Sequence, residues 1–400
     1  MKVCVIGAGI VGCATAYQLA SLGLKVHLME SRGEVGTQTS FANGAQLSYS
    51  YVEPFASPAT LRSLPAMLLS SESPVRFRLR ADWRQWAWGL RFLTACTKRR
   101  AQAGTLNLLE LAQLSRATLT EWMLREHWSF EFKQNGKLVM CPDLDTLRRQ
   151  GAQVRFQASH GCQQEILNMR QCLQREPTLE AVAGKFAGGV WTADECVGDP
   201  YLLCSEMVKS VRSKGGEVHF NSPVSGFVRR EEQFMAAITP NGQIDADAFV
   251  LATGPHAASL ASTFGLYLPI YPIKGYSITV PMRRENRPCV SVTDLARKTV
   301  FAPLGSQLRV AAMAEISGYG MNIPEEHIED LVRSTAATYP GLCDVSAPMA
   351  WAGLRPCTPS SVPIIGQIGA SNMYVNVGHG ALGLTLAAGS AARLASLLRH

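Results

Sequence analysis

The sequence predicts an α/β protein, α+β overall, with two domains: one built on a parallel sheet and one on an antiparallel sheet. Three observations carry this prediction. The first thirty residues alternate strand, glycine-rich turn, helix and strand, which is the repeating unit of parallel sheets. Two more glycine-bearing turns follow apolar strands near residues 253 and 378. Between those turns, residues 266–349 alternate short apolar segments with turns, a pattern typical of antiparallel sheets.

The opening segment has the layout of a Rossmann-like dinucleotide site. An apolar strand at 2–6 is followed by a G-x-G-x-x-G turn, a helix at 13–22 and a strand that ends on Glu30. The turn alone is a weak signal, but the complete pattern predicts that a dinucleotide binds here. In such a turn, Gly7 permits the tight bend, Gly9 lets a pyrophosphate approach, and Gly12 lets helix and strand pack closely. Glu30 is placed to accept hydrogen bonds from the adenosine ribose. The alternative is a glycine-rich turn that binds no ligand.

Composition limits the class of protein and its compartment. A hydrophobic fraction of 47% with 17% charged residues indicates a globular chain,. The eleven cysteines include no C-x-x-C pair, so we expect reduced thiols, no metal site and a cytoplasmic location. The net charge of +7 comes without a nucleic-acid reader motif, and we expect no nucleic-acid partner. The first strand begins at residue 2 and no apolar stretch approaches about 18 residues, so we expect neither a signal peptide nor a membrane span.

Residues 60–100 combine basic and aromatic side chains. Arginines and lysines greatly outnumber acids there, and tryptophans stand at 83, 86 and 88. One hypothesis is an amphipathic segment that touches an anionic membrane surface. The other, which the pattern favours, is a helix that buries its tryptophans in the protein and exposes its arginines to solvent.

The remaining elements define the domain organisation. Helices are predicted at 106–126, 144–158, 163–173, 201–214, 325–339 and 385–398, and Asp199 before Pro200 is a typical N-cap,. Strands are predicted at 137–140, 217–220, 222–224, 247–252, 276–280, 299–301, 308–312 and 373–377,. Because the glycine-bearing turns recur at both ends of the chain, we expect a discontinuous dinucleotide-binding domain of residues 1–60, 200–265 and 345–400. Residues 61–199 and 266–344 then form the substrate domain.

The number of glycine-bearing turns favours one dinucleotide over another. If both chain ends build one domain, the turns at 7–12, 253–254 and 378–383 converge on one ligand. A nicotinamide cofactor needs one such turn, whereas FAD is long and reaches several loops. The sequence therefore favours FAD, which we expect to be held non-covalently.

Four motifs occur in an order that resembles a known family. They are Thr-Ser-Phe-Ala-Asn-Gly-Ala-Gln at 39–46, Pro-Ile-Lys-Gly-Tyr-Ser at 272–277, Trp-Ala-Gly-Leu-Arg-Pro at 351–356, and the glycine-rich stretch 376–385. Together they are similar to the FAD-dependent D-amino acid dehydrogenases of the small-subunit type, relatives of D-amino acid and glycine oxidases. The resemblance covers nearly the whole chain. Two departures are Gly44-Ala45-Gln46, where the family usually reads Ala-Gly-Gln, and an end at His400, short of the family's usual tail.

The resemblance implies which residues meet the flavin. It places the adenine end by Glu30 and Val224, the ring by Ser40, Ala42 and Gln46, and the turn at 378–385 over the pyrimidine edge. The expected cofactor-binding residues are Gly7, Ala8, Gly9, Ile10, Val11, Gly12, Glu30, Ser31, Arg32, Ser40, Ala42, Asn43, Gln46, Val224, Ala252, Thr253, Gly254, Gly378, His379, Gly380, Ala381, Leu382, Gly383, Leu384 and Thr385.

The resemblance also implies the reaction. A D-amino acid, or another small amino or imino acid, transfers a hydride from Cα to flavin N5, and the imino acid is hydrolysed to an oxo acid and ammonia. Electrons then pass to a quinone or another acceptor. Arg355 suits the substrate carboxylate because guanidinium forms a bidentate pair with it, and Tyr276 or Tyr271 are expected to close the pocket. An oxidase of glycine or sarcosine type that forms hydrogen peroxide, and a flavin-binding protein without turnover, remain alternatives.

Two further residues have a chemical and a structural interpretation. His379 stands in the last glycine-rich turn, where it is either a catalytic base or, as we expect, a structural or flavin-contacting residue. Cys357 follows Arg355 and Pro356, and some relatives anchor flavin through a cysteine in this region. No matching motif surrounds Cys357, so we expect no covalent link.

Overall fold

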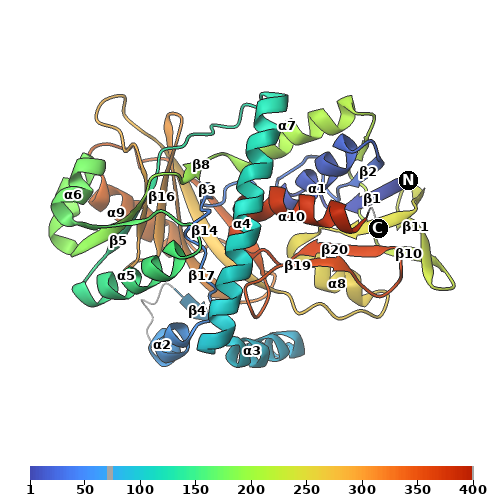
Figure 1. The fold of residues 1–400 in the computed structure, drawn as a ribbon, viewed down its shortest axis with the longest axis horizontal. Helices are drawn as coiled ribbons and strands as arrows, with labels where there is room; N and C mark the ends of the chain where they lie inside the picture. The colour runs from blue at the N-terminus through green and yellow to red at the C-terminus, as the bar shows by residue number, and fades with distance from the viewer. Residues whose placement is uncertain (70–74, 399–400) are drawn as a thin grey trace.

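The computed structural model describes residues 1–69 and 75–398. Two sheets stand side by side, and the long helix α4 (Lys98–Glu126) runs between them across the molecule (Figure 1). The chain starts in one of these domains and returns to it at its end (Figure 1). The mixed α/β architecture predicted from the sequence is confirmed.

The first sheet has the strand order β19-β20-β13-β1-β2-β9. Its strands are parallel except β19, which is antiparallel to β20. They span β1 Lys2–Ile6, β2 Lys25–Met29, β9 Glu217–His219, β13 Ala248–Leu251, β19 Ile364–Gln367 and β20 Met373–Val377. Apolar side chains on both faces are buried: Val3 and Val5 pack with the helices, and Cys4 and Ile6 pack on the opposite side.

Helices cover one face of this sheet, and a small sheet covers the other. The helices are α1 (Ile10–Ser21), α7 (Pro200–Ser213) and α10 (Gly383–Leu397), and the small sheet comprises β10 (Gly226–Arg230), β11 (Gln233–Thr239) and β12 (Gly242–Asp245). The predicted cap of α7 is confirmed, since the Asp199 carboxylate accepts from the backbone N–H groups of Tyr201 and Leu202. The second short strand predicted at 222–224 is absent, and the chain crosses this stretch without regular structure.

The second sheet has nine strands, in the order β18-β14-β17-β16-β15-β5-β7-β6, with β4 paired to β17. Most pairs are antiparallel, and β15–β5 and β17–β4 are parallel. The strands span β4 Val75–Phe77, β5 Lys137–Cys141, β6 Glu165–Asn168, β7 Gly188–Thr192, β14 Tyr271–Pro281, β15 Ser291–Asp294, β16 Thr299–Leu304, β17 Gln307–Ile316 and β18 Met349–Cys357. Helices α5 (Leu144–Ala158), α6 (Met169–Arg175) and α9 (Glu325–Thr338) lie on this side of the molecule (Figure 1). The helix predicted at 163–173 is wrong in its first half, because residues 165–168 pair with β7 and Asn168 then caps α6.

Two segments lie in a different domain from the one predicted from the sequence. Strand β18, placed by the boundary at 345 with the dinucleotide domain, pairs with β14 in the second sheet. Helix α4, placed with the substrate domain, packs on α10 in the core of the first domain. The contact is close because Gly389 of α10 has no side chain: a Cβ there would lie 2.5 Å from the Leu111 carbonyl oxygen. An amphipathic pattern says that a helix buries one face but not against which partner.

The shorter elements are β3 (Gln46–Leu47), α2 (Pro58–Leu69), α3 (Trp83–Ala95), η1 (Pro177–Lys185), β8 (Cys196–Val197), η2 (Gly254–His256), α8 (Ala257–Ser262) and η3 (Gly380–Leu382). The stretch Gly380–Leu397 is long and apolar enough to cross a membrane, which corrects the expectation that the chain holds no such stretch. In this fold it is mostly buried and packs with α1 and α4.

Candidate active site

A cavity of about 1160 Å³ opens between the two sheets. It exceeds the usual range for small-ligand pockets, about 300–1,000 Å³. Its walls come from the glycine-bearing turns of the first sheet and from the facing surface of β14, β17 and β18. The turns meet because they follow β1, β13 and β20, which are adjacent parallel strands and therefore end at the same edge. Ligands of open parallel sheets bind at this edge.

The turn after β1 has the geometry of a phosphate-binding loop. Gly7 adopts a φ of +102°, which favours glycine,. A Cβ on Gly12 would lie 1.7 Å from the Gly7 carbonyl oxygen, so the helix approaches the turn as closely as it does only because residue 12 is glycine. A Cβ on Gly9 would meet only the Ser40 Oγ, at 3.5 Å, and would project towards the cavity.

Glu30 lies at the end of β2 and is nearly buried. Its Oε2 accepts from the Ala8 N–H at 2.9 Å, and its Oε1 accepts from the Arg32 N–H at 2.9 Å and from the Ser31 hydroxyl at 3.0 Å. These contacts hold the carboxylate beside the phosphate-binding turn, in the wall of the cavity.

Most of the predicted cofactor-binding residues line this one cavity, although they come from six separate stretches of sequence. Those in the wall are Gly7, Gly9, Ile10, Val11, Glu30, Ser31, Ser40, Ala42, Asn43, Gln46, Val224, Ala252, Thr253, Gly254, Gly378, His379, Gly380, Ala381, Leu382, Gly383, Leu384 and Thr385. The predicted residues Ala8, Gly12 and Arg32 are not among those that line the cavity. Ala8 is buried behind the turn, Gly12 faces Gly7, and Arg32 is exposed and contributes its backbone N–H to Glu30.

Several groups in the wall suit a long anionic ligand such as FAD. Helices α1 and α10 both begin at the cavity, and neither N-cap residue caps its helix with a side chain, although the Ile10 N–H of α1 donates to the Ser40 hydroxyl. Such ends carry free N–H groups and a partial positive charge. The Thr253 Oγ1, Asn376 Oδ1 and His379 Nε2 atoms are buried in this wall without a hydrogen-bond partner in the described residues. Buried polar atoms without partners are rare, so the wall is suited to a ligand that supplies those partners.

His379 is neutral in this setting. Burial lowers the pKa of the imidazole to about 3, because a charged ring would lose its hydration there. A ring with this pKa is a weak base. Its burial in the wall fits the expected structural or ligand-contacting role better than that of a catalytic base.

Arg355 projects across the second sheet towards the cavity. It lies on β18, beyond Gly275 of β14, and its Nη1 donates to the Met313 carbonyl oxygen of β17 at 2.7 Å. Burial lowers the pKa of the guanidinium, and no described carboxylate pairs with it. The cavity thus holds an arginine whose natural counter-charge is an anionic ligand.

A bulge in β17 presents the Met313 carbonyl to Arg355. The β14–β17 register moves from Lys274 opposite Glu315 to Tyr276 opposite Ala312, so β17 carries an extra residue there. Met313 itself adopts a φ of +67°, a conformation that strains a residue with a side chain. Bulges commonly occur beside binding sites and redirect neighbouring groups.

The two predicted tyrosines do not present their hydroxyls to this arginine. Tyr276 contributes to the cavity wall, but its hydroxyl donates to the Glu315 carboxylate. Successive strand residues point to opposite faces, and Tyr276 packs in the core on the far side of the sheet. Tyr271 lies outside the wall, where it packs beneath α3 against Trp88, and its hydroxyl lies 3.3 Å from the Asp82 carboxylate. Tyr276 therefore lies in the wall as predicted but with its hydroxyl turned away, and Tyr271 lies outside the wall.

A buried lysine in the cavity wall, Lys137, was not predicted from the sequence. Lys137 on β5 donates to the Ser48 hydroxyl at 2.8 Å, and its ammonium lies 4.5 Å from the centre of the Tyr51 ring. Burial lowers the pKa of Lys137 to about 8, opposed in part by the charge of Glu195. Ser48, Lys137 and Tyr51 line the cavity. The only sequence signal was a lysine at the start of an apolar strand, because the partners come from distant segments.

Cys357 does not form part of the cavity wall. Burial raises the pKa of its thiol to about 12, so the sulfur is protonated and a poor nucleophile. Its backbone carbonyl accepts from the indole of Trp88 at 2.8 Å, which attaches α3 to this strand.

Comparisons with known proteins give matches along nearly the whole chain. The family model for FAD dependent oxidoreductases (DAO) matches residues 2–397. D-amino acid dehydrogenase 2 of Ralstonia nicotianae is 39% identical over 100% of this chain and 96% of its own length. Among solved structures, glycine oxidase from Geobacillus kaustophilus superposes with a TM-score of 0.78 at 18% identity, covering 100% of this chain and 95% of that one. The L-α-glycerophosphate oxidase of Mycoplasma pneumoniae with FAD bound superposes with a TM-score of 0.73 at 16% identity, covering 100% and 94%.

The match over nearly the whole chain confirms the resemblance stated from the sequence motifs. FAD is the cofactor, and the cavity at the ends of β1, β13 and β20 has the residues to hold it. The chain belongs to the FAD dependent oxidoreductase family.

Proposed function

We propose that the protein oxidises a D-amino acid, or another small amino or imino acid, by FAD-dependent oxidative deamination. The observation that carries this proposal is Arg355, a guanidinium without a described acidic partner that faces a flavin-type cavity. Relatives over the full length are called D-amino acid dehydrogenase. A carboxylate is the anion that every amino acid offers, and guanidinium binds it through two parallel hydrogen bonds.

FAD supplies the hydride acceptor. The substrate loses a hydride from Cα and a proton from nitrogen, which leaves an imino acid. Water then converts this product to the oxo acid and ammonia. The two electrons leave through a quinone or another acceptor.

The protein's own contribution is to orient the substrate. Arg355 anchors the carboxylate, and the Met313 carbonyl holds the guanidinium in place. Gly275 leaves space beside it, because its missing side chain would occupy the guanidinium position. Fixing the carboxylate restricts where Cα can lie, and such positioning accounts for much of the rate enhancement in enzymes whose cofactor performs the chemistry.

We further propose that FAD is held non-covalently. The protonated thiol of Cys357 and its place outside the cavity wall support this. Precipitation of the yellow protein with acid should release the flavin into the supernatant. Colour that stays with the pellet would contradict the proposal.

Anaerobic mixing of the holoenzyme with single substrates tests the activity. We expect D-amino acids to bleach the oxidised flavin band, whereas glycine and sarcosine should not. Bleaching by glycine or sarcosine, with hydrogen peroxide formed in air, would support the oxidase alternative. An unchanged flavin spectrum with every amino and imino acid would leave a flavin-binding protein without turnover and overturn the proposal.

A second proposal concerns the location of the protein. We propose that helix α3 contacts the inner face of the cytoplasmic membrane, where a quinone is accessible. Trp83, Trp86, Leu90 and Leu93 follow helical spacing and are 61%, 53%, 65% and 45% exposed, whereas Trp88 is buried. The expectation that the tryptophans are buried is therefore wrong for two of the three. Exposed arginines and lysines at 91 and 98–100 lie near this face, and Arg84 is half-buried and donates to Ser259 and Ser262; basic residues beside an apolar face are typical of helices that bind anionic lipid. Residues 70–74 of the basic segment lie outside the described part of the chain.

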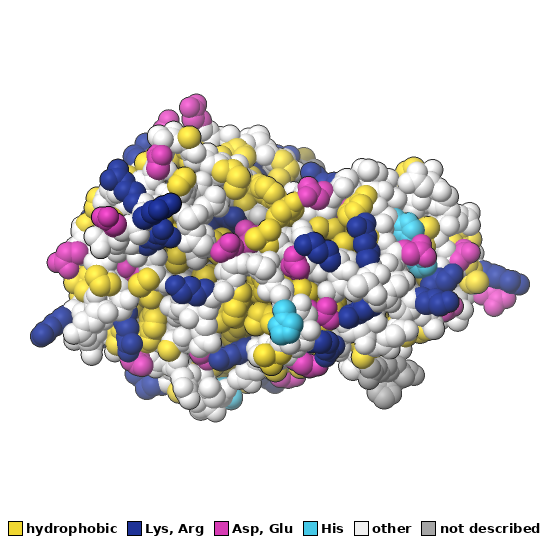
Figure 2. Space-filling model, turned by 90° about the horizontal axis from the view of Figure 1, so that it is seen from above, with side chains coloured by type: hydrophobic (Ala, Val, Ile, Leu, Met, Phe, Trp, Pro, Cys, Tyr) yellow, Lys and Arg dark blue, Asp and Glu magenta, His cyan; other side chains and the backbone are white. Residues whose placement is uncertain are grey.

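Binding of nucleic acid would require a surface on which basic side chains cluster. On the face shown in Figure 2, lysine and arginine side chains are interspersed with aspartate and glutamate. The face drawn there carries charges of both signs side by side and not a continuous basic surface.

A further inference from the structure

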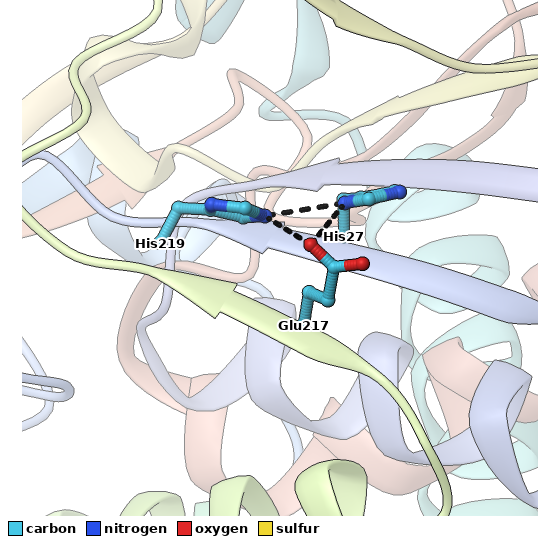
Figure 3. Close-up of side chains that lie close together, drawn as sticks. All are labelled: His27, Glu217 and His219. Atoms are coloured by element: carbon cyan, nitrogen blue, oxygen red, sulfur yellow. Dashed lines mark hydrogen bonds and ion pairs between the residues drawn. The ribbon is translucent and has the colours of Figure 1, made fainter. Parts of the chain in front are cut away.

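Two histidines and a glutamate meet at the outer edge of the first sheet. His27 lies on β2, and Glu217 and His219 lie on the neighbouring edge strand β9. His27 stands directly opposite Glu217, and Met29 stands opposite His219. Because residues two apart on a strand share a face, all three side chains project from the same side of the sheet and point towards one another (Figure 3).

The three facing atoms form a nearly equilateral triangle. The His27 Nδ1 lies 3.5 Å from the Glu217 Oε2 and 3.1 Å from the His219 Nε2, and the last two atoms lie 3.4 Å apart. Tetrahedral zinc with bonds of about 2.0–2.1 Å holds its ligand atoms about 3.3 Å apart. The protein thus presents three corners of a tetrahedron before any ion is added.

The donor types select the class of ion. Two imidazole nitrogens and one carboxylate oxygen suit zinc and its first-row neighbours, whereas calcium and magnesium prefer oxygen ligands. The Glu217 side chain is 64% exposed, so water can reach the fourth corner.

We propose that His27, Glu217 and His219 bind one divalent ion of the zinc class, which fastens edge strand β9 to β2. No sequence motif indicates this site, because 192 residues separate the two histidines. It differs from the expectation of no metal, which rested on the absence of paired cysteines.

The site is linked to the adenosine end of the cofactor cavity by backbone hydrogen bonds. The Glu30 N–H donates to the His219 carbonyl oxygen at 2.8 Å, and the Ser222 N–H donates to the Glu30 carbonyl oxygen at 2.8 Å. Residues 222–225 then form part of the cavity wall. An ion that fixes the position of β9 should therefore also fix residues 222–225 of the cavity wall. The loss of FAD should then be slower.

Zinc titration of the tag-free, chelator-treated holoenzyme tests the proposal. Cys289 is an exposed thiol and a competing zinc ligand, so the experiment uses the Cys289→Ser background. Competition with a chromophoric chelator should reveal one tight zinc equivalent, and X-ray absorption should report about two imidazoles at about 2.0–2.1 Å. At a 100-fold excess over the dissociation constant, the melting temperature should rise by a few degrees, about 2–5 °C.

Three variants and a control decide the assignment. His27→Ala and His219→Ala should each weaken zinc binding by more than the roughly 10–100-fold that loss of an outer partner costs. Glu217→Gln changes an exposed side chain with little change in shape, and should weaken binding even if a histidine variant folds poorly. His160→Ala removes an exposed histidine elsewhere and should leave binding unchanged.

Three outcomes would overturn the proposal. The first is no tight zinc equivalent in the Cys289→Ser holoenzyme. The second is binding that survives both histidine substitutions, which would place the ion elsewhere. The third is zinc that binds at this cluster without raising the melting temperature or slowing FAD release, which would refute the fastening of β9.

Discussion

Arg355 and Met313 are joined across an intervening strand: the Arg355 Nη1 donates to the Met313 carbonyl oxygen at 2.7 Å. Strand β14 separates the two parent strands, β18 and β17. The guanidinium can cross because the intervening residue is Gly275, whose Cβ would lie 2.3 Å from Nη2. The bulge that gives Met313 its positive φ directs the carbonyl to this point. The position of the substrate anchor is therefore set by three strands together.

The first prediction is that Arg355→Ala removes the anchor of the substrate carboxylate. Transition-state binding should fall by on the order of 3–5 kcal/mol, as for truncation of a buried charge pair. Arg355→Lys should recover only part, because an ammonium lacks the bidentate fork. Steady-state kinetics measures the loss. FAD content and melting temperature should stay near the parent values, since Arg355 has no described acidic partner; loss of flavin with a normal KM would make it a structural residue.

The second prediction is that Gly275→Ala displaces the guanidinium without unfolding the protein. The added methyl group would overlap the end of a flexible side chain and not the backbone. Overpacking of this kind costs on the order of 1–3 kcal/mol, and we expect the cost to appear in kcat/KM for amino acids. Gly184→Ala, at a position with open space around it, serves as the control. Unchanged kinetics in Gly275→Ala would show that substrate binding does not depend on the observed Arg355 position.

The third prediction concerns the phosphate-binding turn. Gly9→Leu should abolish FAD binding, because a Cβ at residue 9 projects into the cavity and meets only Ser40 nearby. The fold should persist, since the new side chain occupies space reserved for the ligand. Flavin absorbance relative to protein, together with circular dichroism, measures both effects. Gly184→Leu adds the same side chain at an exposed site and should keep full flavin content.

The fourth prediction is a pH dependence of stability that arises from His379. Burial lowers its pKa to about 3 in the folded protein, from the ordinary value of 6.5. Above pH 6.5 the ring is neutral in the folded and the unfolded protein, so it does not make the free energy of unfolding depend on pH. Between 6.5 and 3 only the unfolded chain takes up the proton, so stability falls as the pH falls, by up to about 1.4 kcal/mol per pH unit. Denaturant unfolding from pH 7 to 5 should therefore show a smaller decline in His379→Gln. Equal declines in the two proteins would contradict the low pKa.

The fifth prediction is salt-sensitive membrane binding through α3. The folded holoenzyme should co-sediment with anionic liposomes at low salt and be released at high salt, because each basic residue near the surface contributes about 1 kcal/mol that salt screens. Trp83→Ser with Trp86→Ser should weaken binding, as both side chains are exposed. Leu124→Ser alters an exposed leucine on another helix and should have no effect. Absence of binding at low salt would refute the membrane contact.

The sequence by itself determined the features that depend on neighbouring residues. An apolar strand followed by glycines and a helix is a local pattern, and it predicted the turns at 7–12, 253–254 and 378–383. Their convergence followed as well, because parallel strands share a carboxyl edge. Arg355 was found through the residues around it, which resemble a family motif.

Only the tertiary structure decided which groups meet across the chain. The face to which Tyr276 points depends on one residue of strand register, and its hydroxyl lies with Glu315 instead of the cavity. Helix α4 packs closely on α10, far along the chain, because Gly389 of α10 has no side chain at the contact. Lys137 with Ser48, and His27 with His219, come from segments that no spacing connects. Contacts of this kind form when distant strands pair and pack, and a sequence pattern encodes the face that is buried but not the surface that covers it.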